Sequence, residues 1–183
     1  LPRKLTAIGA SAFLNCESLE SIDIPDTVTE IGDRAFVNSG LRMLVIPSSV
    51  TAVNYDLCNE NHNLNEVVFS PNTKSVEMTA FSGCSNLKNI DLPDGLEKIG
   101  KMAFLSSVNA RIYIPQSVTD IEKKAFNDNA VIYGYANSAA EEFAKNNDIK
   151  FVAVNSHDEY LSLLTYSDTD NSSYKSAIDE LSQ

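Results

Sequence analysis

The segment Ile31-Gly32-Asp33-Arg34-Ala35-Phe36 decides the fold, because its pattern recurs along the chain at a spacing of 22 or 23 residues. The pattern consists of Ile or Val, three residues, a small residue and Phe. Its six copies begin at Ile8, Ile31, Val53, Val76, Ile99 and Ile121. The third copy departs most, since it ends in Leu57-Cys58 instead of Ala-Phe. A fixed period of this length predicts a solenoid, in which each repeat forms one turn and stacks only on its neighbours.

A second pattern fills the rest of each period. It is Leu41-x-x-Leu44-x-Ile46-Pro47 in one repeat, and related stretches begin at Leu19, Leu64, Leu87 and Asn109. The alternation of apolar and polar residues predicts a strand that is buried on one side, and Pro ends it because Pro has no N–H for a ladder. Each turn should therefore hold one strand, a short second extended piece such as residues 28–31, and a tight Ala-Phe turn. A glycine follows the Ile in three turns, where a left-handed backbone is possible but not obligatory.

Together the two patterns resemble the BspA-type leucine-rich repeats of bacterial surface proteins. The resemblance covers roughly residues 1–154, and residues 132–135, 138–144 and 151–154 look like the closing unit of that family. It implies a secreted or surface-anchored bacterial protein used for adhesion or partner binding. We therefore predict an α/β repeat solenoid: a leucine-rich-repeat array of about six turns with a parallel β-sheet, short second strands and turns. A helix–strand cap at about residues 130–154 should close it.

The two ends of the chain look different. Residues 1–8 fit the repeat in mid-turn, from which we expect a fragment of a longer protein with further repeats upstream. At the other end, Ser138 should cap a helix over about 139–147, and residues 149–154 should form a last strand. Residues 155–183 hold six acidic residues and one lysine, so they form an acidic helical tail or linker.

The tail predicts two short helices. Ser156-x-x-Glu159 resembles a capping box, and the second helix would present Tyr174, Ala177, Ile178 and Leu181 on one face. The helices could pack back on the solenoid or lead to a further module, and we slightly favour a linker.

Composition and charge exclude several classes of function. The net charge of −11 disfavours nucleic acid and anionic membranes, and no transmembrane stretch is present. Cys16 and Cys84 share one repeat position three turns apart, about 14 Å, which is too far for a disulfide. Cys58 should point inward, and we expect three buried free thiols. We expect no metal site, cofactor or enzymatic activity, because no CxxC pair, phosphate loop or nucleophile elbow is present.

Neither histidine forms a convincing catalytic site. His62 lies in a polar loop near Glu60, and we expect an exposed loop there in preference to a weak metal or acid–base site. His157 lies in the acidic tail, where we expect it to pair with Asp158 or Glu159 as a solvated charge cluster.

The outward side chains of the strands form the candidate binding face. One column reads Ser21, Met43, Glu66, Asn89, Arg111, and its neighbour reads Asp23, Val45, Val68, Asp91, Tyr113, Tyr133. Apolar residues grouped beside Tyr and Arg favour a protein contact, and we select Met43, Val45, Val68, Arg111, Tyr113 and Tyr133 as partner-binding residues. The alternative is that the acidic tail or a neighbouring copy covers these residues. The irregular loop at residues 55–63 is a second, weaker candidate.

We therefore predict a non-catalytic, extracellular interaction or adhesion module of a bacterial surface or secreted protein. Its partner would be a protein, such as a host extracellular-matrix or other bacterial surface protein, or a glycan, bound by a monomer. The rival hypotheses are a structural spacer or stalk that binds nothing, and an accessory module of a larger secreted enzyme.

Overall fold

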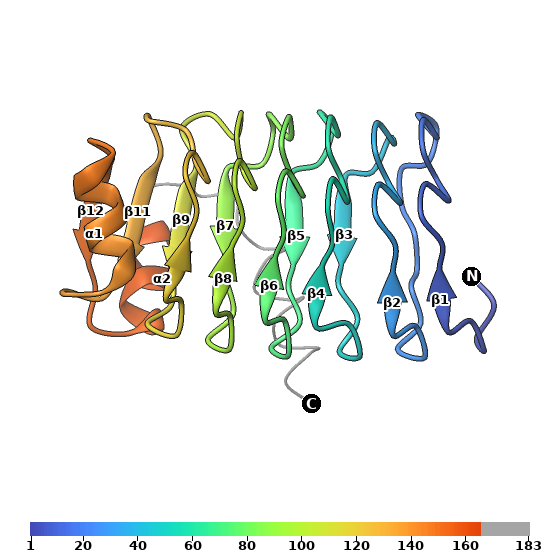
Figure 1. The fold of residues 1–183 in the computed structure, drawn as a ribbon, viewed down its shortest axis with the longest axis horizontal. Coiled ribbons are helices and arrows are strands. Elements are labelled where there is room, and N and C mark those ends of the chain that lie inside the picture. Colours follow the sequence, from blue (N-terminus) through green and yellow to red (C-terminus); the bar gives the residue numbers. More distant parts are fainter. Residues whose placement is uncertain (166–183) are drawn as a thin grey trace.

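The computed structural model describes residues 1–165, which form a solenoid with two rows of parallel strands (Figure 1). We call one the long-strand row; it consists of β3 (Met43–Val45), β5 (Glu66–Val68), β7 (Asn89–Asp91), β9 (Arg111–Ile114), β11 (Val131–Gly134) and β12 (Lys150–Ala153). The short-strand row consists of β1 (Ala7–Ile8), β2 (Glu30–Ile31), β4 (Ala52–Val53), β6 (Ser75–Val76), β8 (Lys98–Ile99) and β10 (Asp120–Ile121). The long-strand row corresponds to the strand that the sequence predicts in each turn. The short-strand row corresponds to the predicted second extended piece.

The strands pair in the register of the repeat. Leu44 lies opposite Val67, and Val76 lies opposite Ile99. The first predicted long strand is an exception. Residues 22–24 form no strand, although the Arg42 N–H donates to the Glu20 carbonyl at 3.1 Å and so joins this turn to the next. Ile22 and Ile24 are only half-buried, because they lie at the end turn of the stack.

The core is one continuous cluster of inward side chains between the two rows. The Phe side chains of the repeat stack in register, with ring centroids 5.3 Å apart for Phe13 and Phe36 and 5.4 Å apart for Phe81 and Phe104. Main-chain hydrogen bonds join the same turns, for example from Phe81 N to Ala103 O at 2.8 Å. Each turn is therefore tied to the next by hydrogen bonds and by packing.

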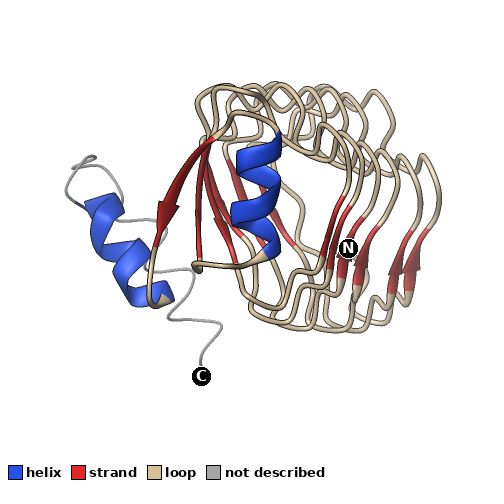
Figure 2. Ribbon diagram, turned by 60° about the vertical axis from the view of Figure 1, so that its left-hand side comes forward, coloured by secondary structure: helices blue, strands red, loops and turns tan. Residues whose placement is uncertain are grey.

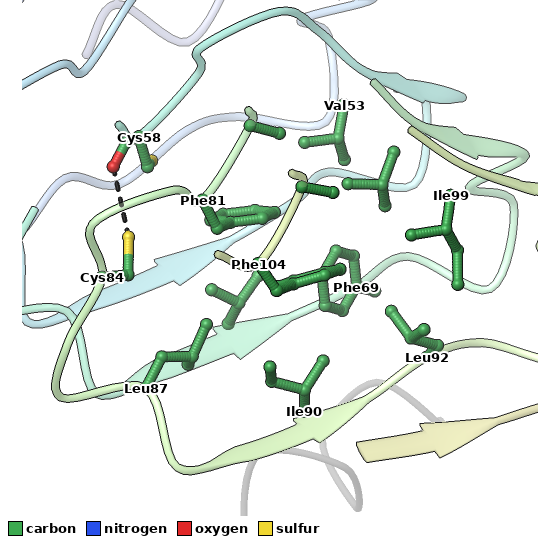
Figure 3. Packing of buried hydrophobic residues seen from close by; sticks show 14 of the residues in the cluster. Val53, Cys58, Phe69, Phe81, Cys84, Leu87, Ile90, Leu92, Ile99 and Phe104 are labelled. Atoms are coloured by element: carbon green, nitrogen blue, oxygen red, sulfur yellow. Dashed lines mark hydrogen bonds between the residues drawn. The ribbon is translucent and has the colours of Figure 1, made fainter. Parts of the chain in front are cut away.

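The third repeat differs from the others at two core positions, one with a smaller side chain and one with a larger side chain. Cys58 occupies the Phe position, and Phe69 occupies the Ile or Leu position of the same turn. Figure 3 shows Phe69 beside Phe81 and Phe104, and the Phe69 and Phe81 rings meet edge to face at 5.8 Å. Phe69 therefore packs on the Phe of the following turn, and Cys58 and Phe69 both belong to the continuous core.

A buried polar ladder, which the sequence reading missed, follows the Phe position by three residues. Ser39 Oγ donates to Asn61 Oδ1 at 2.9 Å, and Asn61 Nδ2 donates to the Phe36 carbonyl at 2.6 Å. Cys84 Sγ donates to the Cys58 carbonyl at 3.2 Å (Figure 3). The ladder satisfies main-chain acceptors inside the solenoid, which explains why small polar residues and Cys recur there.

The tight turns use a left-handed residue, but not at the glycine after the Ile. The left-handed residue lies two positions after the glycine position. It is Ser11, Arg34, Asp56, Thr79, Met102 or Lys124, with φ between 53° and 59°. Gly32 instead permits close approach of two turns, since a Cβ there would lie 2.5 Å from the main-chain N of Ala10.

The carboxyl-terminal cap agrees with the predicted helix and strand. Helix α1 (Ala139–Asn146) begins after Ser138, whose Oγ accepts a bond from the Glu141 N–H at 3.4 Å. Phe143 of α1 packs edge to face on Phe126 at 5.9 Å and closes the end of the core. Figure 2 shows α1 between the two rows of strands at this end.

A second helix, α2 (His157–Thr165), follows β12. Half of the predicted capping box forms, because Ser156 Oγ accepts a bond from the Glu159 N–H at 3.1 Å. Glu159 Oε2 instead accepts a bond from the N–H of Asn155, the residue before the cap, at 2.7 Å. The helix predicted around residues 174–181 lies outside the described residues. Among the helices of residues 1–165, none has the length and apolar character needed to cross a bilayer.

Candidate binding face

The outward side of the long-strand row, which we call the strand face, is divided into two halves. The open half comprises the turns of Asp23 and Val45, and the turn of Val68, which is 8% exposed, lies between the two halves. The covered half comprises the turns of Asp91, Tyr113 and Tyr133, over which α2 lies (Figure 2).

Aromatic stacking holds α2 on the covered half. The Tyr160 ring stacks on Tyr113 with centroids 5.2 Å apart and contacts Tyr133 at the same distance. Tyr113 is 1% exposed and Tyr160 is fully buried. We call this second hydrophobic cluster the aromatic cluster; its residues are Tyr113, Tyr133, Tyr135, Val154, Tyr160, Leu161 and Leu164.

An ion pair fixes the first turn of α2. Nε2 of His157 lies 2.9 Å from both carboxylate oxygens of Asp91, and its ring lies 4.7 Å from the Tyr113 ring. The hydrogen bond to Asp91 raises the pKa of His157, although burial opposes the shift; the charges of Asp91, Asp94 and Asp158 add to it. The expected pairing of His157 with Asp158 or Glu159 is therefore wrong. The Glu159 carboxylate accepts hydrogen bonds from Asn155, and Asp91 reaches the ring from the sheet.

The hydroxyl groups of Tyr113 and Tyr160 differ in their hydrogen bonding. Tyr113 Oη lies 3.5 Å from Asp94 Oδ1. Tyr160 Oη is buried and has no hydrogen-bond partner in the described part of the chain. Burial is the main cause that raises the pKa of both phenols, so both stay protonated at physiological pH.

The structure separates the six residues predicted to bind a partner. Val45 is exposed at 38%, and Met43, Arg111 and Tyr133 are half-buried. Tyr113 and Val68 were selected as surface residues, but both are buried, and for Tyr113 the structure shows the stated alternative, cover by the start of the acidic tail. Tyr113 lies beneath His157 and Tyr160, and Val68 is 8% exposed in the row beside Val45. The sequence does contain a signal for the cover, namely the apolar residues that follow the capping box at Ser156.

The loop of the third repeat forms a small polar surface. Nε2 of His62 lies 3.3 Å from Glu60 Oε2, and Nδ1 lies 2.9 Å from the Gly83 carbonyl. Both side chains of the pair are more than half exposed. Tyr55 and Met78 are exposed on adjacent turns. Within residues 1–165, no group of three or more His, Cys, Asp or Glu side chains is placed to hold a metal ion.

The cysteines behave as core residues with one exception. All three are free thiols, and Cys58 and Cys84 are buried. Burial raises the pKa of Cys58 well above its ordinary value and that of Cys84 to about 12, so neither forms the reactive thiolate at neutral pH. Cys16 is half-buried, against expectation, because it lies in the first turn with a neighbour on one side only.

A solved structure shares this fold. A leucine-rich repeat protein from Bacteroides ovatus is similar at 22% identity with a TM-score of 0.54, over 84% of this chain and 53% of its own. A leucine rich cell surface protein from Faecalibacterium prausnitzii matches at 22% identity and a TM-score of 0.42, over 87% of this chain and 54% of its own. The chain thus spans about half the length of each. No curated protein matches it.

A family model matches nearly the whole of the described chain. The model is that of the BspA type leucine rich repeat region, and six copies of it cover residues 1–74 and 54–170. The six copies of the Ile-x-x-x-Ala-Phe pattern lie within these matched residues. The chain therefore belongs to the BspA-type leucine-rich repeat family.

Proposed function

We propose that this chain is a non-catalytic interaction module of an extracellular or surface-attached bacterial protein, and that it binds a protein or glycan through the open half of the strand face. Membership of a repeat family and a rigid parallel row support an interaction role, because a preformed surface loses little entropy on binding. The adhesion role and the extracellular setting belong to this proposal. The net charge of −11 suits a partner other than nucleic acid.

The observation that carries the proposal is the exposed Val45 on β3. Val45 is 38% exposed and lies beside half-buried Met43 and buried Val68. Ser21 and Asp23 lie on the preceding turn, and an exposed Arg42–Glu20 ion pair with 3.5 Å between its atoms borders it. An apolar centre within a polar rim is the usual anatomy of a protein contact.

A matched pair of variants tests the site. Val45→Arg places a charge in the open half, whereas Val108→Arg makes the same change at a valine of equal exposure, 38%, outside the strand rows. The immobilised native chain and both variants are exposed to extracellular-matrix proteins, to surface extracts of neighbouring bacteria and to a glycan array. We expect a ligand that native protein and Val108→Arg retain and Val45→Arg loses. Equal retention by both variants would contradict the proposed location.

A structural spacer is the second candidate, and one specific observation favours it. Helix α2 covers Tyr113, the aromatic centre of the other half of the face, so less apolar surface is offered to a partner than the sequence suggests. A spacer that binds nothing predicts that no ligand is retained by the native chain or by either variant. An accessory module of a larger secreted enzyme gives the same result for the isolated chain.

A further inference from the structure

We propose that the covered half of the strand face is a docking site for an amphipathic helix that carries a cationic residue three positions before an aromatic residue, and that α2 is its intramolecular occupant. This site lies beyond the one proposed for the open half. A partner helix with the same pattern would bind by replacing α2.

The contacts of α2 define what the site recognises. His157, Tyr160 and Leu164 lie on one helical face, at positions i, i+3 and i+7. The Asp91 carboxylate, only 11% exposed, receives the imidazole, and Tyr113 and Tyr133 receive the aromatic ring. A carboxylate set among aromatic rings suits a cation and a ring presented together by one helical turn.

Side chains, and not a strand ladder, carry the contacts described for α2. The ring contacts and the His157–Asp91 pair attach it to the row. The turns beneath are joined by main-chain bonds, such as Leu92 N to Tyr113 O at 3.3 Å and Val131 N to Ala110 O at 2.8 Å. A helix held in this way can leave the sheet without disrupting the ladder, and local opening of this kind costs less than global unfolding.

The present occupant also fits the site imperfectly. Tyr160 Oη is buried without a hydrogen-bond partner among the described residues. A buried polar group in this state opposes docking. A helix that presents Phe at this position keeps the ring contacts and lacks the unsatisfied hydroxyl, so it should compete with α2.

A peptide-binding experiment tests the proposal on the full chain. The probe is a fluorescent peptide of residues 155–165 that carries Tyr160→Phe. The receptors are the native chain, a Tyr160→Ser chain in which the aromatic anchor of α2 is lost, and that variant combined with Asp91→Asn or with Asp23→Asn. Asp23 is the matched control, since it occupies the same column of the face on the open half. Circular dichroism verifies that the solenoid is intact in each receptor.

We expect the Tyr160→Ser chain to bind the peptide at least about tenfold more tightly than the native chain, in which α2 competes. Asp91→Asn should weaken binding about tenfold, as loss of a charged hydrogen bond does, and Asp23→Asn should leave it unchanged. Absence of binding to a folded Tyr160→Ser chain would overturn the proposal. So would equal affinities for the Asp91→Asn and Asp23→Asn receptors. Neither result bears on Val45, so the function proposed for the open half stands or fails separately.

Discussion

The solenoid core and the aromatic cluster are both buried and apolar, yet they are held by different forces. In the core, each Phe of the stack lies on the next turn, and a main-chain bond accompanies it, as from Phe104 N to Ala125 O at 2.8 Å. In the aromatic cluster, ring contacts and one histidine–carboxylate pair hold α2 on the sheet. Burial alone therefore does not set local stability. We expect the core to open only with the whole array and the cluster to open alone.

The largest expected effect comes from the core. Phe81→Ala removes a ring that contacts both Phe69 and Phe104, and it should lower the free energy of unfolding by about 3–5 kcal/mol. Chemical denaturation followed by circular dichroism measures the loss. Thiol labelling of Cys58 and Cys84, which flank the site, should accelerate with it. A loss as small as that of an exposed residue would contradict the picture of a stacked Phe column.

The third repeat offers a sharper test of the same column. Cys58→Phe restores the repeat pattern but adds volume at a fully buried position of the turn that already holds Phe69, so it should cost about 1–3 kcal/mol. Adding Phe69→Leu should recover much of that loss, because Leu occurs at this position in the fourth repeat. A double-mutant cycle measures the coupling between the two sites. Additive effects would show that the two exchanges do not compensate.

The smallest effect concerns pH and the aromatic cluster. The pKa of His157 is higher when α2 is docked than when it is undocked. The contribution of His157 to docking is therefore fully present below its undocked pKa of about 6.5, and it is lost as the pH rises through the docked pKa. Because about a third of the His157 side chain is exposed, solvent screening limits the effect to about 1 kcal/mol or less. Hydrogen exchange of the α2 amides, corrected for the intrinsic rate, should show protection falling with rising pH.

Two variants separate this titration from a general effect of pH. Asp91→Asn should remove most of the pH dependence in α2 and leave the exchange of β7 amides within the ladder unchanged. His62→Gln is the matched control, since His62 pairs with Glu60 far from α2 along the chain and should leave that dependence intact. An unchanged pH dependence in the Asp91→Asn protein would show that another group controls docking.

The period of the sequence predicted the strand rows, the inward columns and the helix–strand cap, because each follows from local spacing repeated many times. The binding face was harder to predict. Alternation in a strand tells which side of the sheet Tyr113 faces, but not what a later segment places over it. Asp91 illustrates the difficulty: it looks like a break in an apolar patch, and its role depends on His157, 66 residues away in the chain. The polar ladder of Ser39 and Asn61 was not predicted, because Cys, Ser and Asn alternate at its repeat position.

The line of main-chain bonds between successive turns also has a mechanical consequence. Because those bonds lie along the solenoid axis, a force that separates the ends of the array loads them one turn at a time and not all together. Each turn that peels away releases 22 or 23 residues, about 75 Å of extended chain. Under tension the module would therefore lengthen in nearly equal steps, and the force that it passes to its attachment would be capped by the strength of a single turn.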